Sequence, residues 1–314
     1  MSSLRALAVI LAVLLVACGA AAPAAAPSAT PTAGPTASAA IFPMTVTDDR
    51  GKEISLPAEP RRIVSIAPSA TEIVYALGAG DLLVAVDDFS DYPVEAQALP
   101  KVGGFRASPE AIIAHQPDLI LAVTQAEVVP VLEAQGQRVI VFDAVDIEGV
   151  YKDIVLVGKV LGRDRAAQEL VDRMRTRIDA VAARTRDIPN KPRVLHELDA
   201  TDPSRVYVAG ANNFIDTMIR IAGGVNVGAV GQGPFPQVSA EEIVRADPQV
   251  IVLGDAKYGM TVESVKARPG WSAVDAVRTG RIVPIDPDIV SRPGPRLADA
   301  VEEYARLLHP DVFR

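Results

Sequence analysis

The first half of the chain alternates short apolar runs rich in β-branched residues with segments in which apolar residues recur at helical spacing. The apolar runs lack polar alternation, which is typical of strands buried on both faces of a parallel sheet. These runs are 62–67, 82–86, 118–123 and 138–142. The helical patterns between them are 71–77, 109–116 and 127–135. Alternating strands and helices predict an α/β lobe.

The same rhythm returns in the second half of the chain and predicts a second α/β lobe. The strand candidates are 193–198, 205–209, 249–253 and 281–285. The helix candidates are 213–222, 240–246 and 296–308.

The segment 147–186, between the two halves, contains almost no glycine or proline. Within it, 165–186 places an apolar stripe at helical spacing opposite charged residues. The stripe is Leu170, Met174, Ile178 and Val181. About 22 residues at 1.5 Å each make a helix of roughly 33 Å. One more surface helix of a single domain is the alternative, but the length and position favour a helix that connects two lobes.

Two segments, 108–120 and 239–251, align with each other without a gap. Each begins with a serine suited to capping a helix, continues as a short helix and ends in a buried strand. The alignment puts Glu110 and Glu241 at equivalent positions in the first turn of their helices, where the helix dipole favours a carboxylate. They either support that turn or form a pair of acidic knobs, one on each lobe, for a basic partner.

The N-terminal 17 residues contain one charge, Arg5, followed by the apolar run 7–16. This run is too short for a membrane span and suits a signal peptide. Residues 15–18 resemble a bacterial lipobox, which predicts that Cys18 is lipidated; an ordinary signal peptide with an incidental cysteine is the alternative. Residues 19–40 contain only Gly, Ala, Pro, Ser and Thr, so we expect an unstructured tether on the outer face of the bacterial cytoplasmic membrane.

Composition and missing motifs narrow the function. The 314 residues carry a formal net charge of −8 with no long basic run, so nucleic acid is not expected as a partner. One cysteine and three separated histidines exclude an internal disulfide and a zinc cluster. Nucleotide-binding loops and a serine nucleophile elbow are absent. We therefore expect no enzyme and predict capture of a small molecule between the lobes.

Several segments together resemble the helical-backbone (class III) solute-binding proteins of ABC importers, a family that carries cobalamin, haem and ferric siderophores. The resemblance spans about 61–310. The segments that carry it are 61–72, 77–80, 89–93, 117–120, 222–227, 236–239 and 292–296. It implies two α/β lobes bridged by one long helix, with the ligand in the cleft. It also implies an ABC permease as partner.

Within this family the chain looks most like the vitamin B12-binding proteins. That resemblance places Glu110 and Glu241 on the two glutamates that grip arginines of the permease. It implies no cofactor of the protein's own, with cobalt or iron entering only as part of the ligand. Loop aromatics and rim charges fall on ligand-contacting positions. With Tyr92 added for a siderophore, the predicted ligand-binding residues are Phe89, Tyr92, Phe105, Phe235, Asp288 and Arg292.

The chain departs from the B12 binders at Val123 and Leu198, where an aromatic residue is expected. The loop 102–105 lacks the iron-ligating tyrosine of many haem binders, which makes haem the last choice. Tyr92, Arg106 and Arg292 suit a ferric siderophore, the second choice after a corrinoid. His196, in a predicted strand near the cleft, is a weak metal candidate.

The predicted organisation is a lipoprotein signal at 1–17 and a lipidated tether at 18–40. An N-terminal lobe at 41–146, bridging helices at 147–188 and a C-terminal lobe at 189–314 follow. We expect a monomer. Two other classes stay open: a tethered enzyme that uses the carboxylates Asp87, Asp88, Asp91 and Asp288, and a structural or sensory lipoprotein with a vestigial cleft.

Overall fold

The computed structural model describes residues 42–104 and 106–313. The predictions for the signal peptide, Cys18, the tether and Phe105 lie outside these residues. Among the residues that are described, no helix is long and apolar enough to cross a membrane.

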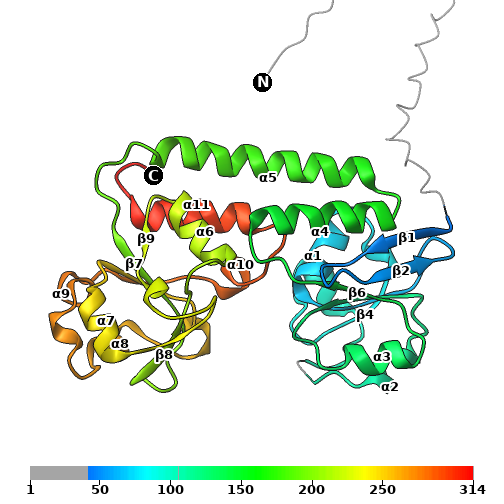
Figure 1. Cartoon of the computed structure of the whole chain (residues 1–314), viewed down its shortest axis with the longest axis horizontal. Coiled ribbons are helices and arrows are strands. Elements are labelled where there is room, and N and C mark those ends of the chain that lie inside the picture. Colours follow the sequence, from blue (N-terminus) through cyan, green and yellow to red (C-terminus); the bar gives the residue numbers. More distant parts are fainter. Residues whose placement is uncertain (1–41, 105, 314) are drawn as a thin grey trace, which may run out of the picture. The chain divides into compact units, whose positions relative to one another are not determined.

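The N-terminal lobe is built on a four-stranded parallel sheet in the order β4-β3-β5-β6 (Figure 1). The predicted strands are confirmed to within a residue or two. They are β3 (Ile63–Ile66), β4 (Leu83–Val86), β5 (Leu119–Val123) and β6 (Val139–Phe142). The predicted helices are α1 (Pro68–Ala76), α2 (Pro109–Ala114) and α3 (Val129–Ala134). An antiparallel hairpin of β1 (Met44–Thr47) and β2 (Glu53–Leu56), which the sequence analysis missed, precedes this sheet.

The C-terminal lobe holds a six-stranded mixed sheet in the order β10-β8-β7-β11-β12, with β9 paired to β7. Its strands are β7 (Arg193–Asp199), β8 (Arg205–Val208), β9 (Val225–Asn226), β10 (Gln237–Ser239), β11 (Val250–Leu253) and β12 (Ile282–Pro284). Its helices are α6 (Phe214–Ile221), α7 (Ala240–Ala246), α8 (Val262–Lys266), α9 (Asp275–Thr279), α10 (Pro287–Val290) and α11 (Leu297–Leu308).

The predicted strand at 205–209 is confirmed as β8, but its direction differs from that of the strands in the first sheet. It runs antiparallel to β7 and β10. The connection from β7 to β8, residues 200–204, is too short for the crossover that parallel strands need, so the two strands form a hairpin instead.

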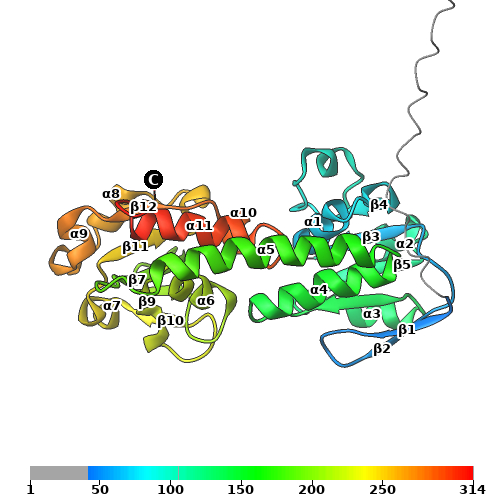
Figure 2. The ribbon, with the colours of Figure 1, turned by 90° about the horizontal axis from the view of Figure 1, so that it is seen from above.

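Two consecutive helices follow the first sheet, α4 (Ile147–Val160) and α5 (Asp164–Thr185). The predicted helix at 165–186 is confirmed to within a residue, and its apolar stripe is buried. Figures 1 and 2 show α5 running along both lobes, with α4 beside it at one end and α11 at the other. Arg177 of α5 also forms ion pairs with Asp299 and Glu302 of α11.

A continuous apolar core on the α5 side joins the lobes. One cluster of buried residues runs from β3 and α1 through α4 and α5 to α6 and α11. Smaller clusters pack on the other face of each sheet. The structure confirms the predicted fold class, two α/β lobes bridged by one long helix.

Candidate functional site

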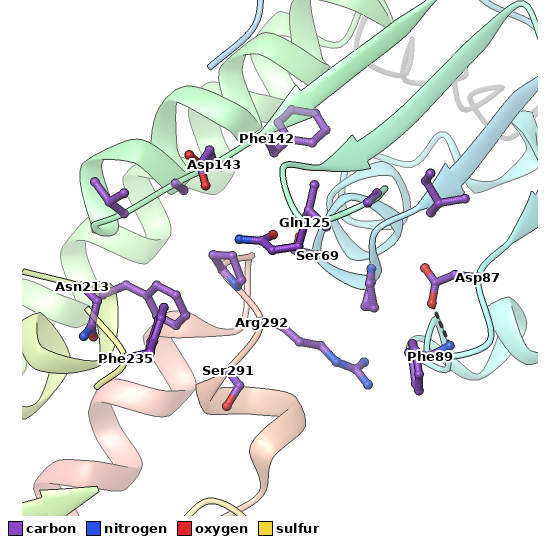
Figure 3. Close-up of a pocket in the computed structure, with 18 of the residues that line it drawn as sticks. Ser69, Asp87, Phe89, Gln125, Phe142, Asp143, Asn213, Phe235, Ser291 and Arg292 are labelled. Atoms are coloured by element: carbon purple, nitrogen blue, oxygen red, sulfur yellow. Dashed lines mark hydrogen bonds between the residues drawn. The ribbon is translucent and has the colours of Figure 1, made fainter. Parts of the chain in front are cut away.

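A cavity of about 600 Å³ lies between the two lobes (Figure 3). On the N-terminal lobe its walls come from the carboxyl ends of β3, β5 and β6 and from the segments that follow β3, β4, β5 and β6, which is where open parallel sheets bind ligands. These residues are Ile66, Pro68, Ser69, Asp87, Phe89, Gly104, Ala107, Val123, Gln125, Ala126, Val128, Phe142, Asp143, Ala144 and Val145. The C-terminal lobe contributes Asn212, Asn213, Phe214, Pro234, Phe235, Ser291, Arg292 and Pro293.

Aromatic rings from both lobes face this cavity. Phe89 and Phe235 are each 44% exposed and both line it. Phe142 and Phe214 line it as well. Neither was predicted from the sequence, although Phe142 ends a predicted strand and Phe214 lies at the start of a predicted helix. Exposed rings that face each other across a cleft gain free energy when an apolar ligand covers them.

The loop that carries Phe89 is anchored from behind by Asp87. One carboxylate oxygen of Asp87 accepts a bond from the Phe89 N–H at 2.7 Å, and the other accepts one from the Ser90 hydroxyl at 2.9 Å. Thr71 shares a hydrogen bond of 2.8 Å with Ser90. Burial raises the pKa of Asp87 despite these bonds. The buried polar chain therefore fixes the backbone of the Phe89 wall.

Gly104 lies directly against the Phe89 ring. A Cβ at position 104 would stand 2.9 Å from Cε2 of Phe89, closer than carbon atoms pack. Gly104 is not among the glycines with a positive φ, so its backbone does not require glycine. The missing side chain instead leaves room for the Phe89 ring beside the cavity.

A network of ion pairs crosses between the lobes at the edge of the cavity. Glu72 of α1 accepts bonds from Arg296 at 2.6 and 2.8 Å, and Arg292 approaches it to 3.3 Å. Arg292 also pairs with Asp91 at 2.8 Å. The Glu72 side chain is only 2% exposed, so these contacts join the lobes within the protein rather than on its surface.

Three of the predicted ligand-binding residues, Phe89, Phe235 and Arg292, are brought together at the cavity. Tyr92 and Asp288 are not among its lining residues. The guanidinium of Arg296 lies 4.2 Å from the centre of the Tyr92 ring, and Asp288 pairs with Arg292 at 2.8 Å and with Lys257. Both residues therefore belong to the inter-lobe network, which the sequence analysis did not predict.

The end of the cavity near α4 is acidic. Asp143, which follows β6, lines it, and the Asp143 N–H donates to Asp49 at 2.6 Å. Behind it, burial together with the charge of Asp49 and Asp143 raises the pKa of Asp153 in α4 to about 8. With that pKa, Asp153 carries a proton at neutral pH.

His196 lies in the interior of the C-terminal lobe, away from the cavity lining. Its Nδ1 shares a hydrogen bond of 2.7 Å with the Tyr304 hydroxyl, and burial lowers its pKa to about 3. In the described part of the chain, no group of three His, Cys, Asp or Glu side chains is placed to hold a metal ion.

Glu110 and Glu241 are both exposed in the first turn of a short helix, α2 and α7 respectively. Figure 1 shows α2 and α7 on different lobes, both on the side of the body away from α5. The Ser108 hydroxyl donates to Glu110 at 2.6 Å and holds the pKa of that carboxyl below its usual range. In α7 the capping box uses Glu242, which leaves Glu241 outside the cap.

Two α/β lobes around a mostly apolar cleft define a protein that captures a small ligand between its lobes. The chain belongs to the periplasmic binding protein family, whose model matches residues 63–289. This family consists of solute-binding proteins.

Relatives and a solved structure agree with this assignment. An uncharacterized ABC transporter substrate-binding lipoprotein of Bacillus subtilis (strain 168) is 33% identical over 87% of this chain and 88% of its own length. A cobalamin-binding protein of Halobacterium salinarum is 31% identical over 86% of this chain and 75% of its own. A periplasmic heme-binding protein of Roseiflexus sp. RS-1, in apo form, has a TM-score of 0.72 at 30% identity and covers 81% of this chain and 99% of its own.

Proposed function

We propose that this chain is the lipid-anchored receptor of an ABC importer and that it captures a corrinoid-like metal chelate between its lobes. The cavity of about 600 Å³ between the lobes carries this proposal, because its size and its apolar walls suit the apolar faces of a large macrocycle. The similar cobalamin-binding protein of Halobacterium salinarum supports the choice of ligand. The chain delivers the ligand to a permease and catalyses no reaction.

The side chains around the cavity favour a ligand whose metal is already fully coordinated. The described lining residues include no histidine, tyrosine, methionine or cysteine, the side chains that usually bind the iron of haem. A corrinoid that supplies its own ligands to cobalt, or a ferric hydroxamate with six oxygen donors, needs none of them. The order of ligands is therefore corrinoid, ferric siderophore, then haem, with the last two as alternatives within the same class.

The same proposal covers the membrane anchor of the receptor and its contact with the permease. Lipidation of Cys18 and the tether at 18–40 would keep the protein on the outer face of the cytoplasmic membrane. Glu110 and Glu241, one on each lobe, would meet basic residues of the permease, with the receptor acting as a monomer. Their exposure and their equivalent places in α2 and α7 support this role.

An absorbance titration of the purified protein tests the proposed ligand class. Cyanocobalamin, haem and a ferric trihydroxamate are added separately and their spectra are followed to saturation. Saturable one-to-one binding of cyanocobalamin with the highest affinity is the expected result. If only an iron chelate binds, that chelate takes the place of the corrinoid as the proposed ligand. If none of the three compounds binds, the receptor role for metal chelates is contradicted.

Substituting Gly104 with alanine is expected to weaken binding of cyanocobalamin at least tenfold. The new Cβ would displace the Phe89 ring, and the backbone of Phe89 cannot follow because Asp87 holds it. The ring therefore has to turn away from position 104, which changes the shape of the wall that the ligand would contact. The dissociation constants of Gly104→Ala and of Gly104→Ala with Phe89→Leu measure this effect.

The smaller leucine should restore most of the affinity for cyanocobalamin in the double variant. Phe89→Leu alone should lower that affinity less than Gly104→Ala does. Equal affinity of the wild type and Gly104→Ala, or a double variant no better than Gly104→Ala, would show that this contact does not set the size of the site.

A further inference from the structure

In the described part of the chain, 42–104 and 106–313, the lining of the cavity offers a ligand no unpaired positive charge. Among the described residues that line it, Arg292 is the cation, and three carboxylates surround its guanidinium. Asp91 and Asp288 lie at 2.8 Å and Glu72 at 3.3 Å. An anionic group on a ligand would compete with these three carboxylates for Arg292.

The network around Arg292 is neutral as a whole, because three cations face three carboxylates. The cations are Arg292, Arg296 and Lys257, and the carboxylates are Glu72, Asp91 and Asp288. Most of these groups lie away from water, where an uncompensated charge is costly. The network therefore cannot release a cation to a ligand without keeping one uncompensated negative charge.

The remaining charged groups of the lining are both acidic. Figure 3 shows Asp143 and Asp87 on opposite sides of the cavity. Asp143 is exposed to it, and Asp49 and Asp153 lie behind Asp143. Arg106 stands in the sequence between the lining residues Gly104 and Ala107, but it is not part of the lining. A carboxylate on a ligand would meet like charge at this end.

The lining also includes neutral polar side chains among its apolar ones. Within 42–104 and 106–313, the side chains of Ser69, Gln125, Asn212 and Ser291 make no hydrogen bond to another residue. Amides and hydroxyls both donate and accept hydrogen bonds. They suit the carboxamide groups of a ligand without needing an opposite charge.

We propose that this cleft selects by charge: it accepts metal chelates whose periphery is neutral or cationic and rejects those that carry carboxylates. This inference rests on the proposed function, since it concerns the same cavity. It assigns Asp143 as the residue that repels anionic ligands. It assigns Gln125 and Asn212 as the neutral residues of the cleft that form hydrogen bonds with amides of the ligand.

Two ligand pairs that differ mainly in charge test the inference on the full-length protein. The first pair is cyanocobalamin and the monocarboxylic acids made by hydrolysing one of its peripheral amides. The second pair is a linear ferric trihydroxamate with a free amine and its N-succinyl derivative. Dissociation constants are measured for the wild type, for Asp143→Asn and for Asp179→Asn, an exposed carboxylate on α5 that serves as the control.

For the pair that binds, we expect the carboxylate member to bind the wild type at least tenfold more weakly, a difference of about 1.4 kcal/mol. Asp143→Asn should reduce this ratio of dissociation constants at least threefold, whereas Asp179→Asn should leave it unchanged. Added salt should also reduce the ratio. Equal or tighter binding of the carboxylate member, or a ratio unchanged in Asp143→Asn, would overturn charge selection while leaving the receptor function intact. Failure of every member of both pairs to bind would overturn both proposals.

Discussion

Replacing Glu72 with alanine is expected to lower the free energy of unfolding by about 3 kcal/mol or more, because removing one partner of a buried ion pair strands the other charge. Glu72 is 2% exposed, and the side chains of Arg292 and Arg296 are 12% and 14% exposed. Arg296 then loses its carboxylate partner, whereas Arg292 keeps Asp91 and Asp288. A guanidinium stays charged inside a protein, so Arg296 is left as the stranded cation. Denaturant unfolding monitored by circular dichroism measures the loss.

Glu303→Ala is the matched control for that variant. Glu303 pairs with Arg306 on the surface of α11 at 2.9 Å, and an exposed pair of this kind contributes at most about 1 kcal/mol. Adding Arg296→Leu to Glu72→Ala should recover part of the stability, since the second change removes a stranded cation. A Glu72→Ala loss no larger than that of Glu303→Ala would show that the inter-lobe network does not hold the lobes together.

The double variant Glu110→Ala, Glu241→Ala is expected to bind its ligand with unchanged affinity but to support at least tenfold slower uptake. Neither residue lines the cavity, and both are exposed. Each carboxylate would form a charge-assisted bond to the permease, and such bonds at an interface affect association without touching the ligand. Uptake of labelled cyanocobalamin in cells lacking the native receptor gene measures the loss.

Glu95→Ala with Glu263→Ala controls for a general loss of surface charge. These are also exposed glutamates in the first turn of a short helical segment, one on each lobe, and uptake should stay near the wild-type rate. A large loss of ligand affinity in the Glu110, Glu241 variant would place these residues in the binding site instead. Uptake at the wild-type rate would show that Glu110 and Glu241 are not part of the surface that contacts the permease.

Much of the fold could be predicted because its strands are short runs buried on both faces. The strand β3, for instance, is buried at every position, and its β-branched residues mark it in the sequence. The hairpin β1–β2 was missed since its strands are half exposed, with burial alternating over four residues. The direction of β8 followed from the length of a loop rather than from the pattern of the strand itself.

The candidate site divides in the same way. Phe89 and Phe235 could be expected near a cleft because they sit in loops beside predicted strands. The internal repeat put Glu110 and Glu241 at equivalent positions of two aligned segments. The inter-lobe network could not be predicted, since Glu72 and Arg296 stand 224 residues apart and nothing local links them. The role of Gly104 depends on a distance to the Phe89 ring that only the folded chain shows.

The position of cobalt in crystals grown with cyanocobalamin tests most directly whether the cleft is the binding site. Anomalous scattering at the cobalt absorption edge locates the metal without reference to the rest of the ligand. We expect one peak between the lobes, between Phe89 and Phe235, with no histidine, tyrosine, methionine or cysteine bonded to it. A peak outside the cleft, or none in crystals saturated with the ligand, would contradict the proposed function.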